Sequence, residues 1–575
     1  MFERYILNNL RLKTVIIGKA LEIMIENRWY KNAIIYSLDL ETFMDADQNG
    51  IGDFKGLTRR LEYLRSLGVD VLWLAPFQPT PNKDNGYDIQ DYYGVDPRHG
   101  SSGDFAEFMH LATGMGLKVI IDLVVNHTSD KHPWFQNARK GPEAEFHDWY
   151  VWSDKKPSDW DKGMVFPGVQ KATWTKDKKA DAYFFHRFYD FQPDLNMSNP
   201  EVREEIHRIM NFWISLGVAG FRVDALPFIL ETQEPGETKR KIRFEYLEEM
   251  RRFLQWRSGD AVLLGEANVM PEDAKQYFGE EGEGIHLMFN FYVNQHLFYA
   301  LASKDIKPLK DALKATKDIF PQAQWAQFLR NHDELDLGRL TEEQRQKVFE
   351  RFGPNKNMQL YDRGIRRRLA PMLGSRAHIE LAYSIMFALP GTPVLRYGDE
   401  IGMGDDLSLK EREAVRTPMQ WTDEPNAGFS AASEKDLIHP MISEGAFGYQ
   451  HINVESQRRQ PDSLLNWMTA MIRLRKECPE VGSGEWEVVE VNNPHVLALY
   501  YHWYDQRLLT VHNFSEEPVE VELRLPVDQA SKLVDLLNID ESIADEKSGV
   551  HRLLLGTYGY RWMRVGEISA SLTKK

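Results

Sequence analysis

The 575-residue chain contains a single cysteine, Cys478. One thiol excludes an intrachain disulfide framework and a zinc site built from several cysteines. The sequence also lacks any run of about 18 apolar residues, the length that a transmembrane helix needs. Residues 1–28 lack the long uncharged core of a signal peptide, because Lys19, Glu22 and Glu26 interrupt their short apolar runs. These absences predict a cytoplasmic protein whose residues 1–28 form an N-terminal helical extension.

The chain is also short of positive charge. Lysine and arginine together number 70 and aspartate and glutamate 86, which gives a formal net charge of −16. Nucleic acids and anionic membranes are bound by basic surfaces, so we expect neither as a partner. Hydrophobic residues make up 42% of the chain, and this fraction excludes a wholly disordered protein.

Short runs of apolar and β-branched residues alternate with longer segments of helical period. This alternation is typical of parallel strands that are buried on both faces. Eight such runs predict an α/β fold in which a (β/α)8 TIM barrel closes on itself. An open doubly wound sheet is the alternative, but no glycine-rich phosphate loop follows the first run. The predicted strands are 33–38, 71–75, 119–125, 220–223, 262–265, 287–291, 327–329 and 394–397.

Two segments between predicted strands are too long to be simple barrel loops. Residues 128–196, rich in tryptophan, tyrosine, lysine and aspartate, predict a small inserted domain after the third strand. Residues 334–374, rich in arginine, glutamine and glutamate, predict a helical insert after the seventh. Period-2 alternation then predicts a C-terminal antiparallel β-sandwich over 481–575. The barrel itself would comprise residues 29–127 and 197–480.

Polar side chains follow several predicted strands at the point where each strand ends. The carboxyl ends of the strands meet at one rim of such a barrel, and active sites lie there. We therefore interpret the polar cluster as a site rather than as separate structural residues. Its members are Tyr87, Asp88, Asn126, His127, Arg222, Asp224, Glu266, Asn331, His332 and Asp333.

Two of these carboxylates fit glycosidic bond cleavage. Such chemistry uses one carboxylate as nucleophile and one carboxylic acid as proton donor, about 5–5.5 Å apart in retaining enzymes. Neighbouring strands lie about 4.8 Å apart, so Asp224 and Glu266 at adjacent strand ends would have that separation. Arg222 would keep Asp224 ionised, whereas burial and anionic neighbours would raise the pKa of Glu266.

Four longer motifs resemble the signature regions of a known family. The segments DLVVNH, GFRVDALPF, GEAN and FLRNHDE are similar in order and spacing to those of the α-amylase superfamily, glycoside hydrolase family 13. QPDLN at 192–196 resembles a fifth region in its oligo-1,6-glucosidase-like form. Further segments, including IRRRLAPML, YGDEIGMGDD and RTPMQW, resemble the members of that family that interconvert maltose and trehalose.

The resemblance implies a role for each matching residue. Asp224 would be the nucleophile, Glu266 the general acid/base and Asp333 the transition-state stabiliser. Asp88 and Arg416 would grip the non-reducing end of a terminal glucose, which predicts exo action on small α-glucosides. Tyr87 would stack on the sugar, and the remaining sugar-binding partners would be His127, Arg222 and His332.

Residues 45–53 (DADQNGIGD) place oxygen donors around two glycines. Hard oxygen ligands on a glycine-permitted turn suit Ca²⁺, although a metal-free Asx-turn would use the same residues. The candidate ligands are Asp45, Asp47, Asn49 and Asp53, and the resemblance adds the Ile51 carbonyl. It also implies a second calcium site at Asn126 and Asp194. We expect structural calcium and no organic cofactor.

Three functions stay open. The first is a maltose–trehalose isomerase, the second an α-glucosidase, and the third a non-catalytic amylase-like scaffold. The stretch that follows Phe228 does not match the acidic, asparagine-rich lid expected of the isomerases, so the retaining chemistry is the firmer prediction. Ala225, after the nucleophile, disfavours isomaltose as a substrate. The resemblance also leaves a homo-oligomer open.

Overall fold

The computed structural model describes residues 28–232, 240–525, 532–538, 540–545 and 548–566. Apart from Arg28, the predicted helical extension at 1–28 lies outside these residues. Part of the stretch after Phe228, residues 233–239, also lies outside them.

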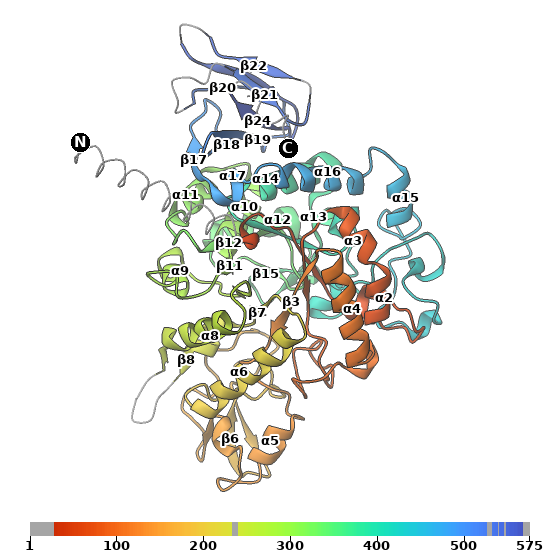
Figure 1. The fold of residues 1–575 in the computed structure, drawn as a ribbon, viewed down its shortest axis with the longest axis vertical. Helices are drawn as coiled ribbons and strands as arrows, with labels where there is room; N and C mark the ends of the chain where they lie inside the picture. Colours follow the sequence, from red (N-terminus) through yellow and green to blue (C-terminus); the bar gives the residue numbers. More distant parts are fainter. Residues whose placement is uncertain (1–27, 233–239, 526–531, 539, 546–547, 567–575) are drawn as a thin grey trace, which may run out of the picture.

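The centre of the molecule is a closed parallel barrel, which confirms the predicted fold (Figure 1). Its strand order around the ring is β1-β16-β12-β11-β10-β7-β3-β2. The seventh strand in sequence, β12, begins at Gln324, three residues before the predicted start at 327. The prediction missed this start because buried polar residues interrupt the apolar pattern there. Gln324 is buried and donates to the carbonyls of Lys31 and Gly482. The barrel strands are β1 (Ile35–Leu38), β2 (Val71–Leu74), β3 (Lys118–Leu123), β7 (Gly220–Val223), β10 (Val262–Gly265), β11 (Leu287–Phe289), β12 (Gln324–Phe328) and β16 (Thr392–Arg396).

Helices surround the barrel and cover its strands. Their starts follow ordinary capping rules: Ser101 and Asp104 form a capping box at α4, and Asn199 caps α6 ahead of Pro200. The barrel interior is filled by apolar side chains such as Ile35, Trp73 and Leu264. The helices around it are α2 (Phe54–Arg59), α3 (Leu61–Leu67), α4 (Ser102–Gly114), α6 (Pro200–Ser215), α7 (Leu226–Leu230), α8 (Phe244–Arg257), α9 (Pro271–Phe278), α10 (Phe291–Ser303), α11 (Lys307–Ala315), α14 (Arg376–Ala388), α15 (Val454–Arg459) and α16 (Leu464–Lys476).

The segment after β3 forms a small body of its own. It contains α5 (Pro133–Ala138) and the sheet β4-β6-β5, made of β4 (Trp152–Ser153), β6 (Ala182–Phe185) and β5 (Trp174–Asp177). Aromatic contacts hold it together, with the ring of Phe135 stacked on Trp152 and packed against Phe184. After β7, the short strands β8 (Glu231–Thr232) and β9 (Lys241–Ile242) pair antiparallel.

The segment after β12 is only partly helical. It contains α12 (Glu342–Phe352) and α13 (Leu369–Leu373), as the sequence predicted. It also contains the sheet β13-β15-β14, formed by β13 (Leu335–Asp336), β15 (Gly364–Ile365) and β14 (Gln359–Leu360). Strands of two residues carry no readable alternation, so the helical interpretation missed them.

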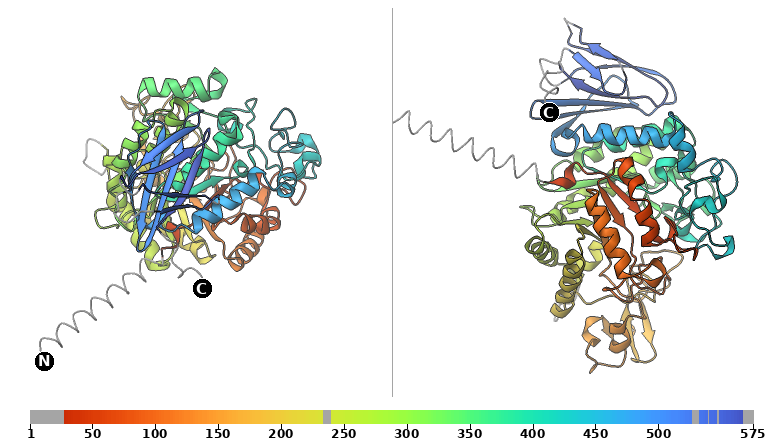
Figure 2. Two further views of the ribbon diagram at one scale, coloured as in Figure 1. Left: turned by 90° about the horizontal axis from the view of Figure 1, so that it is seen from above. Right: turned by 45° about the vertical axis from the view of Figure 1, so that its right-hand side comes forward.

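The C-terminal region consists of a six-stranded sheet, β17-β18-β19-β24-β21-β22, and a two-stranded sheet, β20-β23. Both are antiparallel and enclose apolar residues such as Val511, Val521 and Leu553. They lie at the end of the barrel away from the inserted domain (Figures 1 and 2). Their bounds are β17 (Glu485–Val489), β18 (Val496–Trp503), β19 (Gln506–Asn513), β20 (Val519–Leu523), β21 (Lys532–Asp535), β22 (Glu541–Ile543), β23 (His551–Leu555) and β24 (Tyr560–Val565), preceded by α17 (Glu480–Ser483). Among the described residues, no helix has both the length and the apolar character to cross a membrane.

Candidate active site

The two predicted catalytic carboxylates follow neighbouring strands in register. Val223 of β7 pairs with Gly265 of β10, so Asp224 and Glu266 are the next residues of each strand. One guanidinium connects them: Arg222 Nη1 lies 2.5 Å from Asp224 Oδ1, and Arg222 Nη2 lies 2.9 Å from Glu266 Oε2. Two carboxylates that share one guanidinium lie close together, as a retaining mechanism requires.

Burial dominates the electrostatics of this pair. It raises the pKa of Asp224 to about 6, although Arg222 opposes the rise. Burial also raises the pKa of Glu266 to about 7, again against Arg222 and with help from the Asp224 and Asp333 charges. The expected rise at Glu266 is present. For Asp224 the prediction gave too much weight to Arg222, because desolvation outweighs the ion pair.

Ala225, between the nucleophile strand and α7, has a left-handed backbone with φ of 50°. Its amide donates to Glu266 Oε2 at 3.1 Å. This sparsely populated conformation therefore turns a backbone donor toward the second carboxylate, and strain of this kind is concentrated at functional sites.

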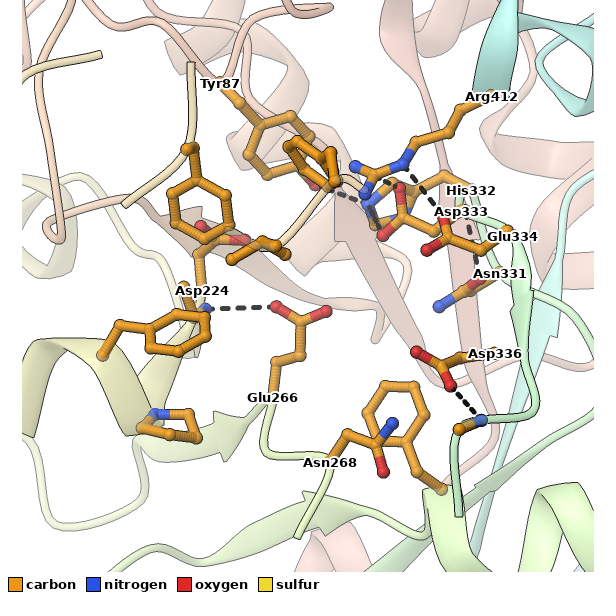
Figure 3. A pocket seen from close by; sticks show the side chains of 18 of the residues that line it. Tyr87, Asp224, Glu266, Asn268, Asn331, His332, Asp333, Glu334, Asp336 and Arg412 are labelled. Atoms are coloured by element: carbon orange, nitrogen blue, oxygen red, sulfur yellow. Dashed lines mark hydrogen bonds and ion pairs between the residues drawn. The ribbon is translucent and has the colours of Figure 1, made fainter. Parts of the chain in front are cut away.

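Asp333 completes the acidic cluster on the opposite side of the cavity (Figure 3). Arg412 Nη1 and Arg416 Nη2 each lie 3.1 Å from its Oδ1, and His332 Nε2 lies 3.3 Å from its Oδ2. Burial would raise the pKa of Asp333, but the Arg412 and Arg416 guanidiniums hold it well below its usual range. Asp333 is thus a fixed negative charge facing the other two carboxylates.

These groups open into one cavity of about 490 Å³, within the usual range for small-molecule sites. Seven of the predicted residues line it, namely Tyr87, His127, Asp224, Glu266, Asn331, His332 and Asp333. Arg222 is buried and contacts the carboxylates of Asp224 and Glu266. The Tyr87 ring is stacked on His332 at 5.5 Å, and burial lowers the pKa values of His127 and His332 to about 4 and about 3, so both imidazoles are neutral near pH 7.

The resemblance implied that Asp88 and Arg416 together grip a terminal glucose, but neither residue lines the cavity. The Asp88 carboxylate accepts from the Lys83 and Asp84 amides and from the Thr80 hydroxyl, so it holds a turn together. Arg416 instead contacts Asp333 and the His332 carbonyl. Of the two aspartates in this turn, Asp84 is the one that lines the cavity. Burial raises its pKa to about 6, and the nearby cations Arg412 and Arg416 partly offset this rise.

Sequence reasoning also missed the walls around the carboxylates. The inserted domain contributes Val165, Phe166 and Phe188, and the segment after β12 contributes Asp336 and Arg363. Arg363 Nη2 donates to the Val165 carbonyl at 3.1 Å and so joins these two walls. Arg412 lies 4.5 Å from the Phe166 ring. Among these wall residues, only Arg412 could have been found from the sequence, because it stands four residues before the predicted Arg416. The other wall residues come from irregular segments.

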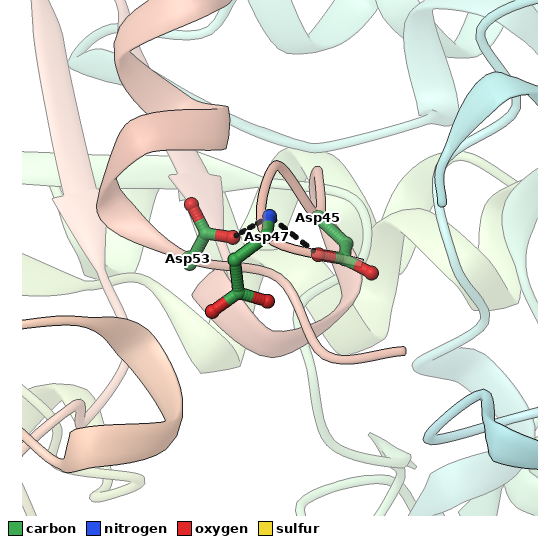
Figure 4. A group of neighbouring side chains, drawn as sticks. All are labelled: Asp45, Asp47 and Asp53. Atoms are coloured by element: carbon green, nitrogen blue, oxygen red, sulfur yellow. Dashed lines mark hydrogen bonds between the residues drawn. The ribbon is translucent and has the colours of Figure 1, made fainter. Parts of the chain in front are cut away.

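The loop at 45–53 gathers acidic oxygens (Figure 4). Oxygens of Asp45, Asp47 and Asp53 lie within 4.8 Å of one another. Asp45 and Asp53 also accept backbone amides of the loop, as an Asx-turn does. Asp47 is exposed, but partial desolvation of its carboxylate and the neighbouring Asp53 and Asp45 charges raise its pKa. The Asn49 amide opposes this rise. Three hard oxygen donors in mutual repulsion fit a calcium ion.

The second predicted calcium site fits less well. Asp194 is buried, and its carboxylate accepts from the Arg187 amide at 2.8 Å and from the Asn126 side chain. Burial raises its pKa to about 7, although the Arg187 and Arg240 guanidiniums lie near enough to lower it. These donors and cations occupy the surroundings that a divalent ion would need, so Asn126 and Asp194 receive no support as ligands.

An eight-stranded parallel barrel with paired carboxylates at the ends of adjacent strands is the architecture of barrel glycosidases. The chain belongs to the α-amylase family: the family model "Alpha amylase, catalytic domain" matches residues 40–484. A second model, "Sucrose hydrolase-like, C-terminal domain", matches residues 506–564. The predicted family is thereby confirmed, and members of it carry out glucosyl transfer or hydrolysis.

Curated relatives extend this similarity over most of the chain. A trehalose synthase of Thermus thermophilus is 42% identical over 547 residues, covering 95% of this chain and 56% of that protein, so the chain spans about half of that relative. A trehalose synthase of Pimelobacter sp. (strain R48) is 40% identical over 556 residues, covering 94% of this chain and 96% of that protein. Among solved structures, a trehalose-6-phosphate hydrolase of Bacillus licheniformis superimposes with a TM-score of 0.74 at 27% identity, covering 94% of this chain and 100% of that chain.

Proposed function

We propose that this protein is a retaining enzyme that interconverts maltose and trehalose by an intramolecular glucosyl transfer. The contact of Arg222 with both Asp224 and Glu266 carries the proposed covalent chemistry, because it holds a nucleophile and a proton donor beside one another, as retaining catalysis needs. The relatives named trehalose synthase support maltose and trehalose as the substrates.

The first half of the reaction uses the two pKa values. Asp224, mostly ionised near pH 7, attacks the anomeric carbon of the terminal glucosyl unit. Glu266, about half protonated there, gives its proton to the departing glycosidic oxygen. The carbon–oxygen bond of maltose breaks, an ester to Asp224 forms, and free glucose is released. Asp333 stabilises the positive charge that develops on the sugar ring.

The second half decides between isomerisation and hydrolysis. If the released glucose stays, its anomeric hydroxyl attacks the ester, Glu266 takes up the proton, and trehalose forms. If water attacks instead, the product is glucose. The cavity walls favour retention of glucose, since Arg363 ties the insert after β12 to the inserted domain and Arg412 packs on Phe166.

Incubation with unlabelled maltose and an excess of isotopically labelled glucose tests this proposal. We expect trehalose as the main product with little label, because the glucose that reattacks never leaves the cavity. Labelled trehalose would show that glucose exchanges with solution. More unlabelled glucose than trehalose among the products of maltose would identify an α-glucosidase. Asp224→Asn is the control. If the wild type converts maltose only slowly and this variant does so at the same rate, the non-catalytic scaffold would be favoured.

We also propose that the loop at 45–53 binds a structural calcium ion. Asp45, Asp47 and Asp53 would supply carboxylate oxygens, with Asn49 and the Ile51 carbonyl as further donors. When bound, the ion would neutralise the loop and fix its turn.

We also propose that the protein is located in the cytoplasm. The only cysteine, Cys478, is buried and free, which suits a reducing compartment. A homo-oligomer stays a prediction.

A further inference from the structure

The Nδ1 atom of His332 is buried and has no hydrogen-bond partner among the described residues. The side chain as a whole is only 2% exposed, so bulk water does not reach it. Buried polar atoms are almost always satisfied, either by the protein or by an ordered water molecule. The surroundings of the ring therefore decide what Nδ1 binds.

His332 also lines a second, small cavity of about 10 Å³, on which Tyr87 borders as it does on the substrate cavity. This is about the volume that one water molecule needs, provided that the site also offers two to four polar partners. The cavity meets both conditions. Its polar lining consists of Asp39, Glu41, Asn85, Tyr87, His332 and Arg416, and Ala75 contributes an apolar part of the wall.

The other ring nitrogen shows which tautomer is present. His332 Nε2 lies 2.8 Å from the Tyr87 oxygen and 3.3 Å from Asp333 Oδ2. The Tyr87 hydroxyl also lies 3.3 Å from Asp122 Oδ2, a carboxylate oxygen that can only accept. Tyr87 therefore donates to Asp122 and accepts from His332, and Asp333 likewise accepts. Both contacts require a hydrogen on Nε2.

Nδ1 must then be an acceptor, because a neutral imidazole carries one hydrogen. The Asp39 carboxylate only accepts, and the donors in the lining bond elsewhere: the Asn85 side chain to Glu41, and Arg416 to the His332 carbonyl and Asp333. A water molecule can supply the donor, because one of its hydrogens reaches Nδ1 while the other reaches a carboxylate. Arg396 Nη1 donates to Asp39 Oδ1 at 2.9 Å and keeps that carboxylate in place.

We propose that this cavity holds one ordered water molecule, which donates to His332 Nδ1 and to the Asp39 carboxylate. Asp39 is thereby a positioning residue that fixes His332 with its hydrogen on Nε2, toward Asp333 and the sugar. It acts through His332 and does not touch the substrate.

The kinetic consequences of this inference rest on the proposed function, but the water and the tautomer are measured without turnover, so the two can fail separately. A high-resolution crystal structure of the sugar-free protein tests the water. We expect it within about 3.2 Å of both Nδ1 and an Asp39 oxygen. An empty cavity, or a protein donor on Nδ1, would overturn the proposal.

Nitrogen-15 spectra of histidine-labelled protein test the tautomer, with the His332 signal assigned by its loss in His332→Gln. We expect an unprotonated Nδ1 and a protonated Nε2. The reverse pattern would overturn the proposal.

A matched pair of variants at Ala75 tests the positioning role. Ala75→Val fills the cavity with methyl groups and should expel the water, mix the tautomers and lower kcat/KM roughly tenfold. Ala75→Ser offers a hydroxyl in place of the water and should stay within about threefold of wild type. Loss of the water in Ala75→Val with tautomer and kcat/KM unchanged would contradict a positioning role.

Discussion

At the scale of single residues, the site contains few cations and many carboxylates. Arg222 alone contacts Asp122, Asp224 and Glu266, whereas Asp333 is contacted by two arginines. The shared cation leaves the pKa values of Asp224 and Glu266 raised by burial, at about 6 and about 7. The doubly paired Asp333 keeps its pKa well below its usual range. In the proposed mechanism, these three groups serve as nucleophile, acid and permanent anion.

These pKa values predict a bell-shaped dependence of kcat/KM on pH. The active form has Asp224 ionised and Glu266 protonated, so activity falls as Asp224 gains its proton below about pH 6 and as Glu266 loses its proton above about pH 7. Both apparent values belong to the coupled pair. Rates measured from pH 4 to 10 provide the check.

In Glu266→Gln, an aryl α-glucoside whose leaving group needs no proton should show no alkaline fall in its glucosylation rate. Persistence of that fall would assign it to another group.

The aspartates at 84 and 88 should separate binding from stability. Asp84→Asn removes a charge from the cavity and should lower kcat/KM by at least about tenfold with an unchanged melting temperature. Asp88→Asn weakens the turn that accepts the Lys83 and Asp84 amides and should lower the melting temperature. Kinetics and thermal unfolding of both variants are the measurement; the opposite pattern would restore Asp88 as the sugar-binding residue.

This pair also shows where sequence reasoning ends. The strand that each candidate follows could be predicted, because strand ends meet at one rim of a barrel. Which of two aspartates four residues apart faces the cavity could not, because it depends on the hydrogen bonds that Thr80 and the loop amides make to Asp88.

At the scale of elements, predictability follows burial. The barrel strands could be predicted because both of their faces are apolar, as in β2 and β10. The two-residue strands β13 and β15 could not, because their pairing depends on distant segments. The loop at 45–53 lies between these cases, since its spacing of oxygens predicts a turn and a calcium site equally well.

Calcium should stabilise that loop. Chelation should lower the melting temperature and added calcium should restore it, since a ligand at a hundred times its Kd contributes about 2.7 kcal/mol. Asp47→Asn should lose most of this response, because Asp47 is exposed and belongs to the oxygen cluster. The exposed Asp423 offers a matched control as Asp423→Asn. A wild-type melting temperature that ignores both chelator and calcium would contradict the metal site.

At the scale of the whole molecule, three parts of the chain enclose the cavity. The barrel supplies the carboxylates, the inserted domain supplies Phe166, and the insert after β12 supplies Arg363. Both insertions could be predicted from their length. Their contact could not, because the sequence of neither segment indicates that it packs against the other. In the proposed mechanism, that contact would decide how well a released glucose is held.

Arg363→Ala should therefore raise the share of glucose among the products of maltose several-fold, while the total rate of maltose consumption stays within about threefold. Arg363 contacts Asp336 and the Val165 carbonyl, and its loss opens the cavity to water. Arg345→Ala, on α12 of the same insert, is the control and should leave the products unchanged. An unaltered ratio in Arg363→Ala would show that this contact does not retain glucose.

The proposed mechanism requires a covalent bond between the sugar and Asp224. A fluorinated glucosyl fluoride that forms the ester quickly and loses it slowly, followed by proteolysis and peptide mass spectrometry, tests this bond directly. We expect one glucosyl adduct, located on Asp224 and absent from Asp224→Asn. An adduct on Glu266 or Asp333, or inversion at the anomeric carbon in the absence of any adduct, would contradict this mechanism.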